Sequence, residues 1–264
     1  MQAQLAKLSE RLTKWLAQLV DVVGRLVMRG ITLLQRFWAW YRSIKWPEIP
    51  LTPLQWVLLF YAIFGILFLV STPIFEASDE RWHFGMVEHL AENNFQLPEQ
   101  DLDDLEAAQD TIYRQEASQP PLYYLTSALI TLPFDLGDSD QYRIENPHAQ
   151  TGNPLSWGNK NMFIHEGIEL GGTALAVYIL RALGLAMGAV TIWAVYHSAK
   201  IAAPHRPPVA IFAAVLTAFN PMFLFIAASV NNDNLVIMLN SLAIWLALLT
   251  MRDGFNTRRS LLIA

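Results

Sequence analysis

The chain has 264 residues, of which 53% are apolar and only 16% are charged, and its mean hydropathy is positive. This apolar content exceeds that of an ordinary water-soluble domain and indicates a membrane protein. Cysteine is absent, which excludes a disulfide framework, a thiolate metal site and a cysteine nucleophile.

Charge is distributed unevenly along the chain. Residues 1–50 hold eight of the eighteen lysines and arginines but only three acidic residues. Between Pro73 and Thr173 the balance reverses, with eighteen of the twenty-three acidic residues against four basic ones. This acidic segment argues against nucleic acid as a partner, because nucleic acid is bound through clustered lysines and arginines.

The basic segment 1–50 carries apolar residues, from Leu5 to Leu26, at alternating three- and four-residue steps, which predicts a helix with one apolar stripe. An aromatic and basic cluster follows between Arg36 and Trp46, a composition typical of the lipid headgroup boundary. We expect an interfacial helix on the cytoplasmic surface. A coiled-coil seam against a partner would also explain the stripe, but it leaves the aromatic cluster without a role.

Four apolar stretches are candidates for membrane-spanning helices, although the last is short for a crossing of ~20 residues. They are Leu54–Thr72, Ala174–His197, Val209–Val230 and Leu235–Met251. The positive charge before the first span predicts a cytoplasmic N-terminus, which puts residues 73–173 and the turn 231–234 outside. The basic residues of the other short loops, such as Lys200 and Arg206, then face the cytoplasm. We expect a multi-pass protein of the plasma (inner) membrane.

The expected fold class is mainly α, a polytopic helical membrane protein with a large extracytoplasmic loop domain after the first span. The parts are residues 1–50, the interfacial helix; 51–72, the first transmembrane helix; 73–173, the acidic loop domain; 174–251, three further transmembrane helices; and 252–264, a cytoplasmic loop and the start of a fifth span. Within the loop domain, Pro120–Phe134 is apolar but too short to span, and we expect it along the interface.

An acidic pair, Asp79 and Glu80, comes directly after the first span. Ser78 is the expected N-cap of a helix that begins at Asp79, and Asp79 and His83 share a face of that helix. A carboxylate pair at the membrane–water boundary can take a proton from an acceptor hydroxyl, and partial desolvation makes it more basic. Acids in a first turn also serve simply to satisfy exposed amides and the helix dipole. On these residues alone, that structural role is favoured.

Two further elements lie on the same predicted side. One is the segment Arg114–Tyr124, which contains Pro120-Pro121-Leu122-Tyr123-Tyr124, and the other is the turn Ser229–Asn234, which contains Asp233. Together with the acidic pair, they resemble the membrane glycosyltransferases of the GT-C class. The closest resemblance is to bacterial members of the protein O-mannosyltransferase-like group, which includes the aminoarabinose transferases of lipid A modification. It covers about Leu54 to Arg252.

The resemblance implies a GT-C-like fold and a sugar donor attached to polyprenyl phosphate, within reach of membrane lipids. It implies transfer with inversion on the extracytoplasmic face, to a protein, lipid or glycan acceptor. It also implies that Asp79 is the catalytic base, with Glu80 as its neighbour. The candidate substrate-binding residues are His83, Arg114, Gln119, Tyr123, Arg181, Asn232 and Asp233. The chain departs from the family in having Ser118 and Gln119 where a histidine often precedes the diproline, and the family's enzymes are usually much longer.

This chemistry requires a cation, because the charge that develops on the leaving polyprenyl phosphate must be stabilised in a low-dielectric site. Arg114 lies beside the diproline element, and Arg181 lies about two turns inside the second span, where an ionisable residue indicates function by default. Arg181 has the alternative of extending to the lipid headgroups, and Arg114 that of a surface salt bridge to Glu116 or another acid. The sequence leaves both alternatives open.

A divalent metal has potential ligands at Asp79, Glu80 and His83, and separately at His165 and Glu166. Glu80 and His83 match the Glu-x-x-His spacing of di-iron bundles, which need two such motifs. The second occurrence in the sequence is Glu145–His148, where Pro147 argues against a regular helix. We therefore expect no metal site and assign no cofactor.

Two other classes of function remain to be weighed. A non-catalytic membrane component would bind lipid or polysaccharide through the acidic outer segment. A transporter would need ionisable groups along several spans, and only Arg181 meets that description. Walker, Gly-x-Ser-x-Gly and His-Glu-x-x-His motifs are absent, which argues against nucleotide hydrolysis, serine esterase and zinc protease chemistry.

Overall fold

The computed structural model describes residues 24–25, 28–33, 35–36, 38–40, 50–99, 111–149, 161–165, 170–255 and 257. The chain divides into two compact units, Met1–Pro50 and Leu51–Ala264. In the first unit the described residues between 24 and 40 are helical and exposed. The predicted stripe before Gly24, most of the aromatic cluster and the start of a fifth span lie outside the described residues.

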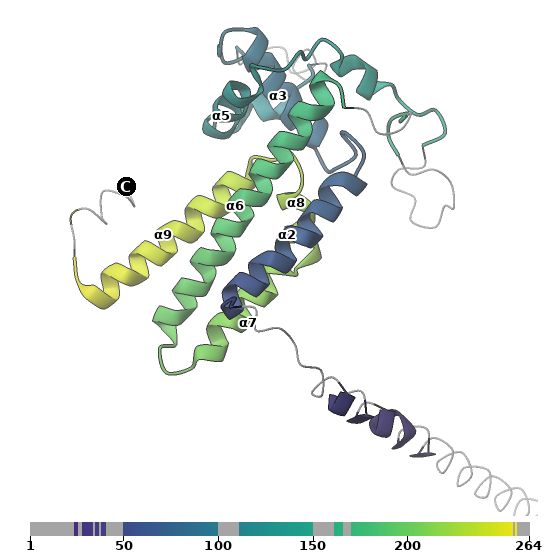
Figure 1. Ribbon diagram of the computed structural model, residues 1–264. Coiled ribbons are helices and arrows are strands. Elements are labelled where there is room, and N and C mark those ends of the chain that lie inside the picture. The colour runs from purple at the N-terminus through teal and green to yellow at the C-terminus, as the bar shows by residue number, and fades with distance from the viewer. Residues whose placement is uncertain are drawn as a thin grey trace, which may run out of the picture. The chain divides into compact units, whose positions relative to one another are not determined.

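In the second unit the described secondary structure is helical, apart from one antiparallel bridge between Glu145 and Phe163. The elements are α2 Pro53–Ser71, α3 Glu80–Glu92, η1 Arg114–Ser118, α5 Leu122–Thr131, η2 Ser139–Arg143, α6 Gly172–Ala202, α7 Pro207–Ala218, α8 Pro221–Ala227 and α9 Asp233–Asp253. The helices α2, α7 and α9 run alongside α6, and α3 and α5 lie at one end of this group (Figure 1).

Among the described residues, α2, α6 and α9 are each long and apolar enough to cross a membrane. The predicted third span is not one helix, because α7 and α8 meet at a 62° bend. Pro221 cannot donate a backbone hydrogen bond, and the Asn220 side chain instead caps α8 by accepting from the N–H groups of Met222 and Phe223. The prediction of a mainly α, polytopic membrane protein is confirmed.

The first span, α2, begins at a capping box in which Thr52 and Gln55 satisfy each other's backbone, with Pro53 at the first helical position. Its buried residues, Val57, Tyr61, Gly65 and Leu69, recur every four residues, and this stripe packs on α6. A Cβ atom at Gly65 would lie 2.5 Å from Leu185 Cδ2, so a larger residue here would require the Leu185 side chain to shift.

Helix α6 has 31 residues, which gives a length of about 46 Å and exceeds the ~30 Å of a bilayer's hydrocarbon core. It starts before and ends after the predicted span Ala174–His197. The buried side chains of Val177 and Leu180, near its N-terminal end, share a core with Phe84 of α3 and Tyr123 of α5. Helix α6 is therefore longer than a bilayer crossing needs, and its N-terminal end supports α3 and α5.

The segment predicted to lie along the interface contains α5. One face of α5 buries Tyr123, Tyr124 and Ala128, and the helix packs against α3. The other face exposes Leu122 and Leu129. The helix is therefore amphipathic, and its apolar outer face stays available for the predicted contact with lipid.

Candidate active site

A buried ion pair joins Glu80 of α3 to Arg181 of α6. The guanidinium of Arg181 donates from Nε to Glu80 Oε1 at 2.8 Å and from Nη2 to Oε2 at 2.5 Å, and both side chains are 0% exposed. Its other N–H groups donate to the carbonyl oxygens of Leu69, Thr72 and Pro73, at 2.6–2.9 Å. The alternative in which Arg181 extends to the lipid headgroups is therefore wrong, because all five of its N–H groups have acceptors inside the protein.

The Glu80 carboxylate also accepts two backbone hydrogen bonds. Phe75 N–H donates to Oε2 at 3.0 Å and Val230 N–H donates to Oε1 at 2.9 Å. Four donors use the lone pairs that a carboxylate offers, so little capacity is left for a substrate proton. These contacts favour a positioning role for Glu80, in which it joins the loop after α2, the helix α6 and the loop before α9.

The helix α3 begins at Glu80, so the expectation of Ser78 as N-cap was wrong by one residue. Asp79 takes the N-cap position in the left-handed conformation, with φ 57°, and its side chain makes no capping hydrogen bond. Instead the Ser78 hydroxyl contacts Asp79 Oδ2 at 3.3 Å, and Asp79 is exposed. The structural role, in which the Asp79 carboxylate satisfies helix amides, is therefore not realised. Aspartate and asparagine adopt this backbone conformation most readily among residues with a side chain.

His83 belongs to a buried cluster with Glu116 and Tyr124. Its Nδ1 atom lies 2.9 Å from the Tyr124 hydroxyl and 3.2 Å from Glu116 Oε2, and the Tyr124 hydroxyl donates to Glu116 Oε2 at 2.8 Å. Burial raises the pKa of Tyr124, and so does its bond to Glu116, so the hydroxyl stays a neutral donor. Glu116 is therefore committed to this cluster and, among the described residues, is not the salt-bridge partner of Arg114.

The pKa of His83 is set by two opposing effects, burial and nearby negative charge. Burial lowers the pKa of His83, and the charges of Glu116, Asp79, Asp233 and Glu80 oppose this effect. Asp79 and Asp233, from opposite ends of the unit's sequence, thus both lie close enough to act on one imidazole. Both aspartates are exposed.

The loop before α9 is held in place by α3 and α5. The Asn231 N–H donates to the Tyr123 hydroxyl at 3.2 Å, and the Asn231 side chain accepts from the Asp233 N–H at 2.8 Å. Asn232 is buried at the N-cap of α9. The structure thus connects Tyr123, Asn232 and Asp233 to the Glu80–Arg181 pair, whereas Gln119 is exposed at the end of η1 and no described contact links its side chain to either aspartate.

Arg114 packs near Trp82 of α3. It is exposed, has φ 41°, and its guanidinium lies 4.7 Å from the centre of the Trp82 ring. It lines an open pocket together with Arg81 and Arg143, two residues for which the sequence offered no signal beyond their charge. Sequence reasoning also missed Glu116, because nothing in its neighbourhood marks it as buried.

The described residues contain no group of three or more histidine, aspartate and glutamate side chains arranged to hold a metal ion. His165 Nε2 contacts Glu76 Oε1 at 3.0 Å, and Glu76 also accepts the N–H groups of Met162 and Phe163. This carboxylate therefore fastens residues 161–165 to the loop after α2. Glu166, the other ligand considered with His165, lies outside the described residues.

A family model described as dolichyl-phosphate-mannose-protein mannosyltransferase matches residues 162–264. The match is less than half of the chain and includes α6 to α9, with Arg181 and Asp233. It supports the class that the motifs predicted, a membrane glycosyltransferase of the GT-C type. The bacterial subgroup stays a prediction, since no curated protein and no solved structure matches the chain.

The histidine cluster gives a prediction for acid stability. The pKa of His83 is lowered in the folded protein, so the unfolded chain binds the proton more readily. The stability that neutral His83 contributes is therefore present above about pH 6.5, the ordinary pKa of histidine. It is lost as pH falls through the folded pKa. Changing His83 to Gln should flatten the fall in melting temperature below that pH. The control His148→Gln changes an exposed histidine and should leave the fall unchanged. An unchanged profile for His83→Gln would show that His83 does not cause the acid loss.

Proposed function

We propose that this chain carries the catalytic centre of a membrane glycosyltransferase that moves a sugar from a polyprenyl-phosphate donor to an acceptor hydroxyl on the extracytoplasmic face. The observation that carries the proposal is that the buried Glu80 carboxylate, next in sequence to exposed Asp79, also binds the Val230 N–H of the loop that leads to exposed Asp233. A donor with a polyprenyl tail and a polar head would reach such a site from the bilayer. The family match over α6 to α9 supports the same class of reaction.

In this proposal Asp79 is the general base. It takes the proton of the acceptor hydroxyl while the acceptor oxygen forms a bond to the anomeric carbon. The bond from that carbon to the phosphate oxygen breaks, and polyprenyl phosphate leaves with the electron pair. One displacement of this kind inverts the anomeric configuration. Asp233 lies where it can accept hydrogen bonds from hydroxyl groups of the donor sugar.

The Glu80–Arg181 pair has a positioning role here. Glu80 follows the base directly in sequence and is bonded to the loop that leads to Asp233, so one carboxylate sets the position of both aspartates. Arg181 has no N–H group left for a leaving phosphate, so we assign it to holding Glu80. Preorganisation of this kind matters because a base displaced by 1 Å can lose much of its effect.

The orientation rests on charge. In this proposal the protein lies in the plasma (inner) membrane. The basic segment before α2 and the loop containing Lys200 and Arg206 face the cytoplasm, and α3 and α5 lie outside.

The donor class is tested with the full chain in proteoliposomes. We expect a labelled sugar to leave a polyprenyl-phosphate donor in the presence of an acceptor, with inverted configuration in the product. The same sugar on a nucleotide should not be used. Binding of the lipid donor without any product would instead favour the non-catalytic alternative, a membrane component that binds lipid or polysaccharide.

A further inference from the structure

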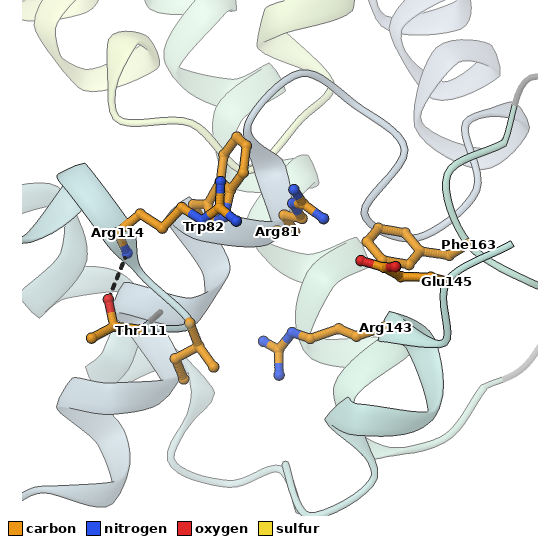
Figure 2. Close-up of a pocket in the computed structure, with 8 residues that line it drawn as sticks. Arg81, Trp82, Thr111, Arg114, Arg143, Glu145 and Phe163 are labelled. Atoms are coloured by element: carbon orange, nitrogen blue, oxygen red, sulfur yellow. Dashed lines mark hydrogen bonds between the residues drawn. The ribbon is translucent and has the colours of Figure 1, made fainter. Parts of the chain in front are cut away.

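The external segment contains an open pocket of about 240 Å³ that the proposed reaction does not use. Three arginines from three different elements line it: Arg81 in the first turn of α3, Arg114 at the start of η1 and Arg143 at the end of η2. Figure 2 shows their side chains around one open space, with Trp82 and Phe163 on its walls. No residue that lines the pocket belongs to α2, α6, α7, α8 or α9.

These arginines repel one another. The pKa of Arg81 is lowered by burial first and then by the charge of Arg114, with a smaller contribution from Arg143, while Glu145 and Asp79 oppose the shift. Within the described part of the chain, the buried Nε atom of Arg81 has no hydrogen-bond partner. A buried guanidinium N–H without an acceptor is costly, and an anion in the pocket would remove this cost.

Other side chains hold the three arginines in place. Arg143 donates to Glu88 Oε2 at 2.5 Å, and Arg81 and Arg114 lie 4.2 and 4.7 Å from the centre of the Trp82 ring. Glu145 is the one acidic residue among those that line the pocket. Arg143 is already paired with Glu88, so the positive charge of the pocket comes mainly from Arg81 and Arg114, which lie with Glu145 in an otherwise acidic segment.

We propose that this pocket binds an oxyanion, a phosphate or carboxylate group carried by the acceptor, and so selects acidic acceptors. The inference rests on the proposed function for the identity of the molecule that carries the group. An acceptor is favoured over the lipid donor because the pocket is lined only by external residues, whereas the phosphate of a membrane-anchored donor stays at the bilayer surface. The charge of Asp79 influences the pKa of Arg81, so the proposed base lies near the pocket. An acceptor whose anionic group is bound here would bring its neighbouring hydroxyl group to Asp79.

Binding is tested on the full chain in detergent, with inorganic phosphate and glucuronate as probes and glucose as the neutral control. We expect saturable binding of both anions, detected by stabilisation against thermal unfolding, and none of glucose. Arg114→Gln should weaken anion binding about 10-fold, the size expected for one charged hydrogen bond. Glu145→Gln should strengthen it several-fold, and Arg206→Gln, which changes an exposed arginine outside the pocket, should leave it unchanged. No anion binding, or equal binding by all variants, would overturn the proposal.

Transfer kinetics separate the two possible carriers of the anion. Arg114→Gln should raise KM for an acidic acceptor and leave KM for the polyprenyl donor unchanged, whereas the reverse pattern would contradict an acceptor site. The pocket and the proposed function fail in different ways. Anion binding that depends on Arg114 in a chain without transferase activity would refute only the function, and transfer without anion binding would refute only the pocket.

Discussion

Changing Asp79 to Asn should lower the rate of sugar transfer by about 10²- to 10⁴-fold, the loss typical of removing a general base. The substitution is well matched to the site, because asparagine tolerates the left-handed backbone that Asp79 adopts and is nearly the same size. The side chain makes no capping bond, so folding should be unaffected. The loss should therefore appear in kcat, with melting temperature unchanged.

Asp135→Asn is the matched control for this substitution. Asp135 is also exposed on the external segment, and its Oδ1 atom accepts from the Gly137 N–H at 3.0 Å, a bond that asparagine can keep. We expect full activity from this variant. Normal turnover by Asp79→Asn would remove Asp79 as the base, whatever the behaviour of the control.

Breaking the buried Glu80–Arg181 pair should destabilise the protein by about 3–5 kcal/mol, because one fully buried charge is left without its partner. Both Arg181→Met and Glu80→Gln should show this loss, measured as unfolding in detergent. The double variant should lose less than the sum of the two, since neither charge remains. Transfer activity should fall with all three, because the loops bearing Asp79 and Asp233 lose their common anchor.

The control for the ion pair is Arg252→Met. Arg252 pairs with Asp253 at the exposed end of α9, where solvent screens an ion pair and leaves it little effect on stability. If Arg181→Met were no more destabilising than Arg252→Met, the pair would not hold the external helices together.

The spans were predictable from the sequence because length and apolarity alone specify them. The break at Asn220–Pro221 was visible as a motif, but its 62° angle depends on how α8 caps and packs. Arg181 was identified as an unusual charge in a span. Its partner Glu80 could not be identified in the same way, because Glu80 lies 101 residues earlier and only the fold brings the two side chains together.

The candidate site was predictable in part for the same reason. The motifs identified Asp79, Glu80 and Asp233. They did not show which of these acidic residues is free to act as a base and which is bonded inside the protein, because that depends on burial. Glu80 is buried and saturated with donors, while its neighbour Asp79 is exposed. The cluster of His83 with Glu116 and Tyr124 is a tertiary contact between separate helices, which no local pattern encodes.

The central claim is that Asp79 and Asp233 border one site on the extracytoplasmic side. The chain has no cysteine, so the double variant Asp79→Cys/Asp233→Cys can be treated in cells with a short, membrane-impermeant bifunctional thiol reagent without background. We predict a crosslink between the two positions in intact cells, and none for Asp79→Cys paired with Pro204→Cys in the loop between α6 and α7. A crosslink that forms only after permeabilisation, or none at all, would contradict the account.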